Sequence, residues 1–312
     1  MTISRRTLLA VLAASATAPI RVGRAQSWRA LYPELVYAVV PAENATGVVD
    51  RFTPFVDYLS RELGSKVILR VANDYAAVIE GQRAGNIHIS YYGPASFARA
   101  RLTGVATDAF VIDVNSDGSK GYNSVFYVLA KSPYQKIEDL KGKNLGLVDP
   151  NSTSGYSMPL YTLDKLGISP DSFFAKTQVT GSHENAVLAL AQGTVDAAAN
   201  WWNADDDSNL TRMLNKGMLK NSDGSPMKKE HFRIVLKSEL IINAPTAMLT
   251  NLPPELKAAI RTAFLEAATK DQAAFQRLSD GKNQPFQPVD TAAYDDTIKL
   301  IQFVDRLRKK SS

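Results

Sequence analysis

The residues of this sequence best suited to bind an anion are three consecutive hydroxyl side chains, Ser152, Thr153 and Ser154. They follow a short apolar run, Leu145 to Val148, which is predicted as a strand, and they precede a helical pattern that starts near Met158. The free N–H groups in the first turn of a helix carry partial positive charge, so hydroxyls placed there offer hydrogen-bond donors to an oxyanion without any cationic side chain. The alternative is an ordinary N-cap, for which a single Ser or Thr suffices. A small tetrahedral anion is the ligand that three such residues favour.

His183 lies at the same kind of junction, just before a helical pattern from Glu184 to Gln192. It is placed to donate to the same anion, and a bound dianion would favour its charged form. A histidine at a helix cap is structural as often as functional, so both roles stay open. His88 alternates within an apolar strand and is interpreted as a core residue, whereas His231 follows charged residues and is expected at the surface.

Trp201 and Trp202 stand at the end of a predicted strand, where an aromatic side chain can wall off a ligand or simply pack between lobes. The acidic run from Asp205 to Asp207 is interpreted as a solvated loop in preference to a metal site. Asp113, Asn115 and Asp117 imitate the start of a calcium loop, but the twelfth position is Ser124 and not a bidentate carboxylate. We therefore predict neither a metal nor a cofactor.

The usual enzyme motifs are missing from the sequence. Ser152 and Ser154 are not centred in a G-x-S-x-G elbow, no G-x-x-x-x-G-K-[ST] loop occurs, and His183-Glu184 lacks the second histidine of H-E-x-x-H. A pairing of Ser152 with His183 still imitates a hydrolase, although no acid that would orient the histidine is evident. A periplasmic hydrolase acting on a small anion therefore remains the alternative to a binding protein.

Two α/β units in series must position these residues. Apolar runs at Leu35–Val40, 67–71 and 87–91 alternate with helical patterns, which predicts the start of an open parallel sheet. Ligands sit beyond the carboxyl ends of such strands, so Tyr75 and Tyr92 are expected near the mouth of a cleft.

A second α/β run begins near Ser124 and continues to Trp202, and a strand from Phe232 to Lys237 is predicted to return to the first unit. The fold class predicted is α/β with two Rossmann-like lobes joined by a two-strand hinge near Ala130 and Lys237. The predicted domains are a signal peptide at 1–25, a first lobe at 26–130 plus 238–312, and a second lobe at 131–237.

The N-terminus, with Arg5 and Arg6 before an alanine-rich apolar segment and small residues near Ala25, predicts a signal peptide and export to a bacterial periplasm. The paired arginines favour the twin-arginine route, with an ordinary secretory signal as the alternative. Four arginines leave with this segment, so the formal charge falls from +5 to about +1. A chain of this charge without basic runs is not expected to bind nucleic acid. The chain has no Cys, which excludes disulfides and a lipid-anchored cysteine.

Several segments together resemble the periplasmic phosphonate-binding components of phosphonate and phosphite ABC importers. They are Asp74-Tyr75-Ala76, Tyr92-Gly93, Gly121-Tyr122, Asp149-Pro150-Asn151-Ser152-Thr153-Ser154-Gly155 and Gly181-Ser182-His183-Glu184, and the resemblance runs from about Val36 to Leu249. It implies a two-lobed type II periplasmic-binding fold that closes on its ligand, a non-catalytic role, and an inner-membrane ABC permease as partner. We expect a monomer.

The resemblance also implies the ligand contacts. The oxyanion-binding positions of the family match Tyr75, Tyr92, Ser152, Thr153, Ser154 and His183, and Trp201, Trp202 and Asn203 are predicted around the rest of the ligand. In relatives that prefer 2-aminoethylphosphonate, two carboxylates hold the ammonium group. The matching positions here are Asn203 and Ala244, and neither is acidic. Asp205 is the alternative to the first carboxylate if the loop from Asp205 to Ser208 is shifted, whereas no residue replaces the second. A buried ammonium without a carboxylate partner is costly, so methylphosphonate, phosphite or another short alkylphosphonate is predicted to be at least as good a ligand.

Overall fold

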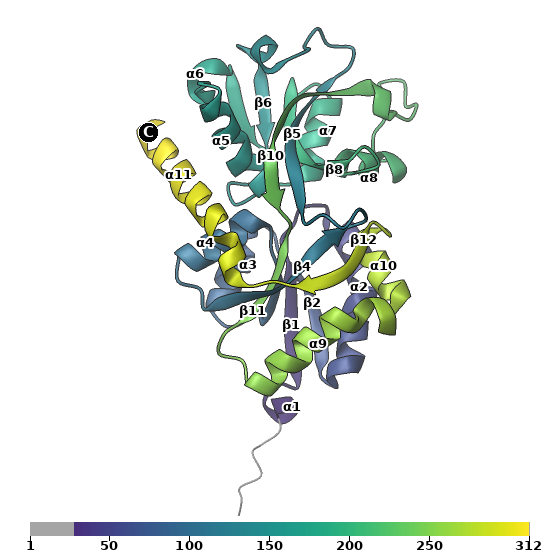
Figure 1. The fold of residues 1–312 in the computed structure, drawn as a ribbon. Helices are drawn as coiled ribbons and strands as arrows, with labels where there is room; N and C mark the ends of the chain where they lie inside the picture. Colours follow the sequence, from purple (N-terminus) through teal and green to yellow (C-terminus); the bar gives the residue numbers. More distant parts are fainter. Residues whose placement is uncertain (1–27, 312) are drawn as a thin grey trace, which may run out of the picture.

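The structure, a computed structural model, describes residues 28–311 of the chain. Its strands form two separate sheets with helices packed around them, and Figure 1 shows these as two lobes stacked one above the other. The two α/β units predicted from the sequence are therefore present. The predicted signal peptide, residues 1–25, lies outside the described residues.

The first lobe is built on a mixed sheet with the strand order β12-β4-β11-β3-β1-β2. Strand β1 pairs in parallel with β2 and β3, as the sequence predicted, whereas β11 and β12 pair antiparallel to their neighbours. The strands are β1 (Glu34–Val39), β2 (Lys66–Val71), β3 (Ile89–Tyr91), β4 (Thr107–Asn115), β11 (Pro245–Leu249) and β12 (Asn283–Pro288). The helices are α1 (Trp28–Leu31), α2 (Ala45–Leu63), α3 (Tyr75–Arg83), α4 (Pro94–Leu102), α9 (Pro254–Lys270) and α10 (Gln272–Ser279), with a 3₁₀ turn η4 (Thr291–Tyr294).

Local sequence signals fix the helices that face the second lobe. Helix α2 starts at Asn44, whose side chain accepts a hydrogen bond from Gly47 N, and α3 starts at Asp74, whose side chain accepts from Ala77 N. Helix α4 starts after Gly93 with Pro94 in its first position, where the missing N–H costs nothing. The N-termini of all three helices consequently follow the carboxyl ends of parallel strands.

The second lobe has the strand order β10-β5-β8-β6-β7, with the short β9 paired to β8. Strand β6 runs parallel to β7 and β8, and β5 and β10 are antiparallel additions. The strands are β5 (Gly121–Leu129), β6 (Asn144–Leu147), β7 (Lys176–Val179), β8 (Ala197–Ala204), β9 (Asp207–Ser208) and β10 (Phe232–Ile242). The helices are α5 (Met158–Lys165), α6 (Pro170–Phe173), α7 (His183–Ala191) and α8 (Asn209–Asn215), with the 3₁₀ turns η1 (Ile137–Leu140) and η3 (Lys229–His231) and a π-helical turn η2 (Thr153–Ser157).

The strand from Phe232 was predicted to return to the first lobe, and that prediction is wrong. Strand β10 pairs with β5 from Phe232↔Leu129 to Ile242↔Gly121, so both strands belong to the second sheet. The chain reaches the first sheet only at β11, two residues after Ile242. For the lobe boundaries we propose crossings at 116–120 and 243–244 in place of Ala130 and Lys237.

The C-terminal helix α11 (Asp295–Ser311) contacts both lobes, and Figure 1 shows it running up one side of the molecule past α4 toward α5. Ile301 packs with Ala95 and Ala98 of α4, and Arg99 forms a two-pronged ion pair with Asp305 at 2.6 and 2.7 Å. Val304 is buried in the core of the second lobe. This helix therefore joins the lobes on the side away from β12 and α8.

Candidate functional site

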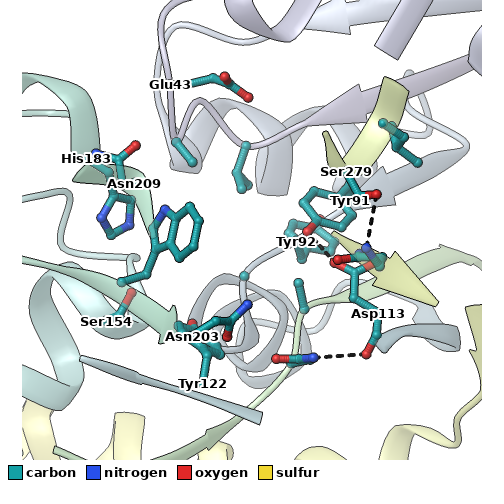
Figure 2. Close-up of a pocket in the computed structure, with 18 of the residues that line it drawn as sticks. Glu43, Tyr91, Tyr92, Asp113, Tyr122, Ser154, His183, Asn203, Asn209 and Ser279 are labelled. Carbon is teal, nitrogen blue, oxygen red and sulfur yellow. Dashed lines mark hydrogen bonds between the residues drawn. The ribbon is translucent and has the colours of Figure 1, made fainter. Parts of the chain in front are cut away.

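A cavity of about 170 Å³ lies between the two lobes. Figure 2 shows His183, Ser154, Tyr122 and Asn203 of the second lobe on one side of it, and Tyr91, Tyr92, Asp113 and Ser279 of the first lobe on the other. Eight of the nine predicted ligand-binding residues line this cavity: Tyr75, Tyr92, Ser152, Thr153, Ser154, His183, Trp201 and Asn203. The convergence of strand-end loops that the sequence predicted is thus observed, while ligand contact by these residues stays a prediction.

The hydroxyl cluster, which we define as Ser152, Thr153 and Ser154, is buried in the turn that connects β6 to α5. Ser152 caps this turn, since its Oγ accepts a hydrogen bond from Gly155 N at 3.1 Å. Gly155 passes close to the preceding strand, where an added Cβ would lie 2.2 Å from Val148 Cγ2. Only glycine fits here without displacing the turn. Gly155 lies within the π-helical turn Thr153–Ser157, a distortion found often at functional sites. Ser152 therefore serves as an ordinary cap and is also one of the residues predicted to bind the anion.

Thr153 links the two lobes directly. Its Oγ1 accepts a hydrogen bond of 2.8 Å from Ala95 N, at the N-terminus of α4 in the first lobe. A threonine hydroxyl that accepts one bond still has its own hydrogen to donate. Thr153 can therefore hold the lobes together and donate to a ligand at the same time.

Two tyrosines approach the hydroxyl cluster. Burial raises the pKa of Tyr75, as does the nearby Asp149, while hydrogen bonding with Ser152 opposes the rise. Burial also raises the pKa of Tyr122 to about 12, against hydrogen bonding with Thr153 and Ser154. Both phenols are protonated at neutral pH and can donate. Tyr122 stands in one of the segments that carry the family resemblance, but it was not predicted as a site residue.

Tyr92 lines the cavity but uses its hydroxyl elsewhere, since it donates to Gln82 Oε1 at 2.9 Å. Its ring, which is fully buried, packs against Phe97 of α4. The expected role of Tyr92 as an oxyanion donor therefore requires that this bond to Gln82 be given up.

His183 is buried and held on both ring nitrogens. Its Nδ1 lies 3.1 Å from Asn200 Oδ1, and its Nε2 lies 3.2 Å from Ser152 Oγ. Burial lowers the pKa of His183 to about 4, although the bond to Asn200 acts in the opposite direction. The charged histidine expected near neutral pH is therefore not the form that this structure favours in the absence of a ligand.

The two tryptophans point to opposite faces of β8, as neighbouring residues of a strand do. Trp201 lines the cavity and lies against the Arg212 guanidinium, 4.9 Å from the ring centroid. Trp202 is not part of the lining; it packs on the second-lobe core, with Lys237 Nζ 3.8 Å from its ring centroid. Trp202 was predicted to lie beside the ligand but does not line the cavity. Successive side chains of a strand point to opposite faces, so only one of the two tryptophans can face the cavity.

Asn203 returns to the cavity face of β8. Its Nδ2 donates to Asp207 Oδ2 at 2.9 Å and to Asn115 Oδ1 at 3.3 Å, while its Oδ1 is buried without a hydrogen-bond partner. Asn243 also donates to Asn115 Oδ1, at 3.0 Å. These amides connect the cavity to both segments at which we propose that the chain crosses between the lobes, 116–120 and 243–244.

Several charged residues in the lining were not predicted. Arg51 pairs with Glu43 at 2.7 Å, and Lys216 of the second lobe reaches the same carboxylate at 3.2 Å. Burial raises the pKa of the Asp113 carboxyl to about 6, although a 2.6 Å hydrogen bond from the Tyr91 hydroxyl opposes the rise. These residues come from a loop, a helix and an antiparallel strand, and no motif in the sequence marks them.

The three carboxylates of the acidic run, Asp205 to Asp207, have different partners. Asp205 pairs with Lys229 at 3.2 Å, Asp206 pairs with Lys282 of the first lobe at 2.7 Å, and Asp207 is buried beside Asn203. Within residues 28–311, no three His, Asp or Glu side chains are grouped closely enough to hold a metal ion.

His88 is not the core residue that was expected: it is half-buried, and its Nδ1 accepts a hydrogen bond from Val36 N at 3.0 Å.

Residues 37–294 match the family model described as the periplasmic substrate-binding protein of phosphonate ABC transporters. The chain is 33% identical to the phosphonates-binding periplasmic protein of Escherichia coli over 253 residues, covering 78% of this chain and 70% of that one. It is 29% identical to the phosphate-import protein PhnD of Mycolicibacterium smegmatis, covering 85% and 84% of the two chains.

Among solved structures, the fold is similar to a binding protein component of an ABC phosphonate transporter from Pseudomonas aeruginosa. The TM-score is 0.75 at 26% identity, over 90% of this chain and 89% of that one. The sequence is therefore similar to these proteins over most of its length, and the fold is similar over nine tenths of the chain.

Proposed function

The chain belongs to the family of periplasmic substrate-binding proteins of phosphonate ABC transporters, and we propose that it captures a small phosphonate-type oxyanion in the cavity between its lobes and delivers it to the permease. The fold is the two-lobed α/β fold of type II periplasmic binding proteins, as predicted. Family membership makes the protein a transport component of the periplasm and not an enzyme, so the hydrolase alternative is set aside. None of the helices within residues 28–311 is long and apolar enough to cross a membrane.

The observation that carries this proposal is the hydroxyl cluster facing two protonated tyrosines. Ser152, Thr153 and Ser154, together with Tyr75 and Tyr122, form what we call the head site, a set of neutral donors in a buried place. Neutral donors that are already oriented stabilise an oxyanion strongly, because little reorganisation is needed when the anion arrives. We assign the phosphonate head group to this site.

The tail of the ligand is expected on the far side of Trp201, among Asn203, Asp113 and Ala244. The carboxylates that would hold an ammonium are absent at Asn203 and Ala244. Asp113 is nevertheless the neighbour of Ala244 across the sheet, since Asp113 N donates to Ala244 O at 3.4 Å. We therefore keep 2-aminoethylphosphonate with methylphosphonate, phosphite and other short alkylphosphonates as candidate ligands.

Contacts between the lobes suggest how a ligand would signal its presence to the permease. Besides Thr153 and Ala95, the Glu184 carboxylate of the second lobe accepts bonds from Asn44 N and Nδ2 at 2.7 and 2.6 Å. Because these hydrogen bonds join the two lobes around the cavity, we interpret the structure as a closed conformation. A ligand that contacts both walls stabilises this conformation by its differential affinity for it.

Calorimetric titration of the purified mature protein with 2-aminoethylphosphonate, methylphosphonate, phosphite and phosphate tests the proposal. We expect tight binding of at least one phosphonate or phosphite, and weakening of it by Ser152→Ala. Ser172→Ala, which alters an exposed hydroxyl on α6, is the matched control. If none of the four compounds binds, or only phosphate does, the proposal is wrong.

The export route and the oligomeric state are also part of this proposal. We propose that the protein is exported by the twin-arginine route and works as a monomer. Blocking the twin-arginine pathway should then retain the precursor in the cytoplasm, and light scattering of the mature protein should give the mass of a single chain.

A further inference from the structure

The hydrogen bonds around His183 determine which ring nitrogen carries the proton. Asn200 Nδ2 donates to His183 O at 2.9 Å, and Asn200 Oδ1 accepts from Trp201 N at 3.0 Å. The orientation of the amide is thereby fixed, and the group that Oδ1 presents to His183 Nδ1 is an acceptor. The proton of the neutral ring therefore resides on Nδ1, and Nε2 carries a lone pair.

Ser152 completes this arrangement. Its Oγ already accepts the hydrogen bond from Gly155 N, so its own hydrogen is the one that points to His183 Nε2, 3.2 Å away. A ligand oxygen that takes over this hydrogen leaves the Nε2 lone pair facing an anion. The His183 ring, which lies beside the head site, therefore presents an acceptor next to the donors of that site, and this acceptor needs a hydrogen from the ligand.

Nothing charged around His183 supplies that hydrogen. On its own helix, Glu184 is bound to Asn44; in the loop before η2, Asp149 accepts from Asn151 N at 2.7 Å. On the other elements that border the cavity, Arg212 of α8 lies 3.4 Å from Asp280 and 3.9 Å from Asp207, and Glu43 is paired with Arg51. Tyr75 of α3 is protonated, and its hydroxyl belongs to the hydrogen bonding with Ser152. The pKa of His183 accordingly responds to burial and to Asn200 alone.

We propose that the head site selects oxyanions that bring an acidic hydrogen, namely the hydrogen phosphonate or hydrogen phosphite monoanion, whose P–OH donates to His183 Nε2. This inference rests on the proposed function and narrows its ligand class. When the monoanion binds, no proton is exchanged with water; when the dianion is the form in solution, binding takes up one proton, which is held between the P–O oxygen and Nε2. A sulfonate has a similar shape and the same charge as the monoanion but no such hydrogen, so it would be rejected.

Sulfonates therefore provide the sharpest probe. A site built to accept a hydroxyl hydrogen discriminates strongly against an analogue that lacks it, because its acceptor is left unpaired. We expect methanesulfonate to bind at least about 100-fold more weakly than methylphosphonate. Above the second pKa of methylphosphonate, its Kd should rise about tenfold per pH unit, with uptake of one proton per ligand.

The experiment is titration calorimetry with methylphosphonate and methanesulfonate across a pH series, in two buffers of different ionisation enthalpy. Two variants change the acceptor without emptying the site. His183→Gln offers an amide that can donate as well as accept, and Asn200→Asp places a carboxylate at Nδ1, which favours a charged ring that donates from Nε2. In each variant, the preference for methylphosphonate over methanesulfonate should shrink at least tenfold, with melting temperatures measured to confirm folding.

The outcomes separate this inference from the proposed function. If methylphosphonate binds the wild-type protein without pH dependence, or methanesulfonate binds within threefold of it, the inference is overturned and the phosphonate receptor stands. An unchanged preference in both folded variants also overturns it. If no phosphonate or phosphite binds at any pH, the proposed function itself fails.

Discussion

Thr153 offers the most direct test of the site, because its single hydroxyl serves both lobes. Thr153→Val keeps the shape of the side chain and removes the oxygen that accepts from Ala95 N at 2.8 Å. In the closed complex, the buried N–H of Ala95 would then lack an acceptor, which costs about 1–3 kcal/mol. A hydrogen bond donated to the anionic ligand would be lost as well, which is worth about 1.5–3 kcal/mol.

Both losses fall on the closed, ligand-bound state, since the open state can hydrate Ala95 N. Together they amount to about 2.5–6 kcal/mol, or roughly a 70-fold to 25,000-fold rise in the Kd for methylphosphonate. Thr153→Ser retains the hydroxyl and should bind within about threefold of wild type. A valine variant that binds within fivefold of wild type would refute the reasoning, and so would a serine variant that is as weak as the valine variant.

Three further predictions concern the same region. Gly155→Ala should weaken methylphosphonate binding at least tenfold in calorimetry, because its Cβ would lie 2.2 Å from Val148 Cγ2. The control Ser172→Ala, on the exposed face of α6, should bind as wild type does. Since the pKa of His183 falls from 6.5 to about 4 on folding, the unfolded chain binds the additional proton, and stability present above pH 6.5 should drop by about 3 kcal/mol as the pH falls to 4. In urea unfolding experiments, the unfolding free energy of His183→Gln should fall less steeply between pH 6.5 and pH 4 than that of the wild-type protein. Equal slopes against pH for the two proteins would contradict this. The raised pKa of Asp113 acts in the opposite direction: the unfolded chain ionises from pH 3.8 but the folded one only near pH 6, so stability is lost as the pH rises between these values. Asp113→Asn should therefore raise the unfolding free energy by up to about 3 kcal/mol above pH 6 and leave it unchanged below pH 4, and a gain of equal size at both pH values would exclude this cause.

The sequence predicted that Tyr75, the hydroxyl cluster and His183 converge because each follows a strand that pairs in parallel with a neighbour. Those strands are β2, β6 and β7, and the carboxyl ends of parallel strands share one edge of their sheet. Tyr75, Ser152 and His183 each stand at the start of a helix that begins at that edge. Their convergence follows from topology alone. Tyr122, on the antiparallel strand β5, was not predicted.

The rest of the cavity depends on features without a local pattern. Asp113 lies on β4 and Ala244 precedes β11, two antiparallel strands that the periodicity did not reveal, so their proximity across the sheet was not foreseen. Arg51 is a charged residue on α2, and its burial is compensated by the ion pair with Glu43, which no apolar pattern in the sequence reveals. Trp201 and Trp202 are equivalent in the sequence, and only the pleat of β8 decides which of them reaches the cavity.

Because of helix α11, different kinds of interaction hold the two lobes together on the two sides of the molecule. Along it, the lobes are joined by Ile301 and Val304 in apolar packing, which added salt does not weaken. On the opposite side the lobes meet through ion pairs near the surface, Lys216 with Glu43 and Lys282 with Asp206, which added salt screens. As the ionic strength rises, the lobes are therefore expected to separate more readily at these ion pairs, while the packing of α11 continues to hold them together. Ligand release should then quicken in salt while the melting temperature changes little.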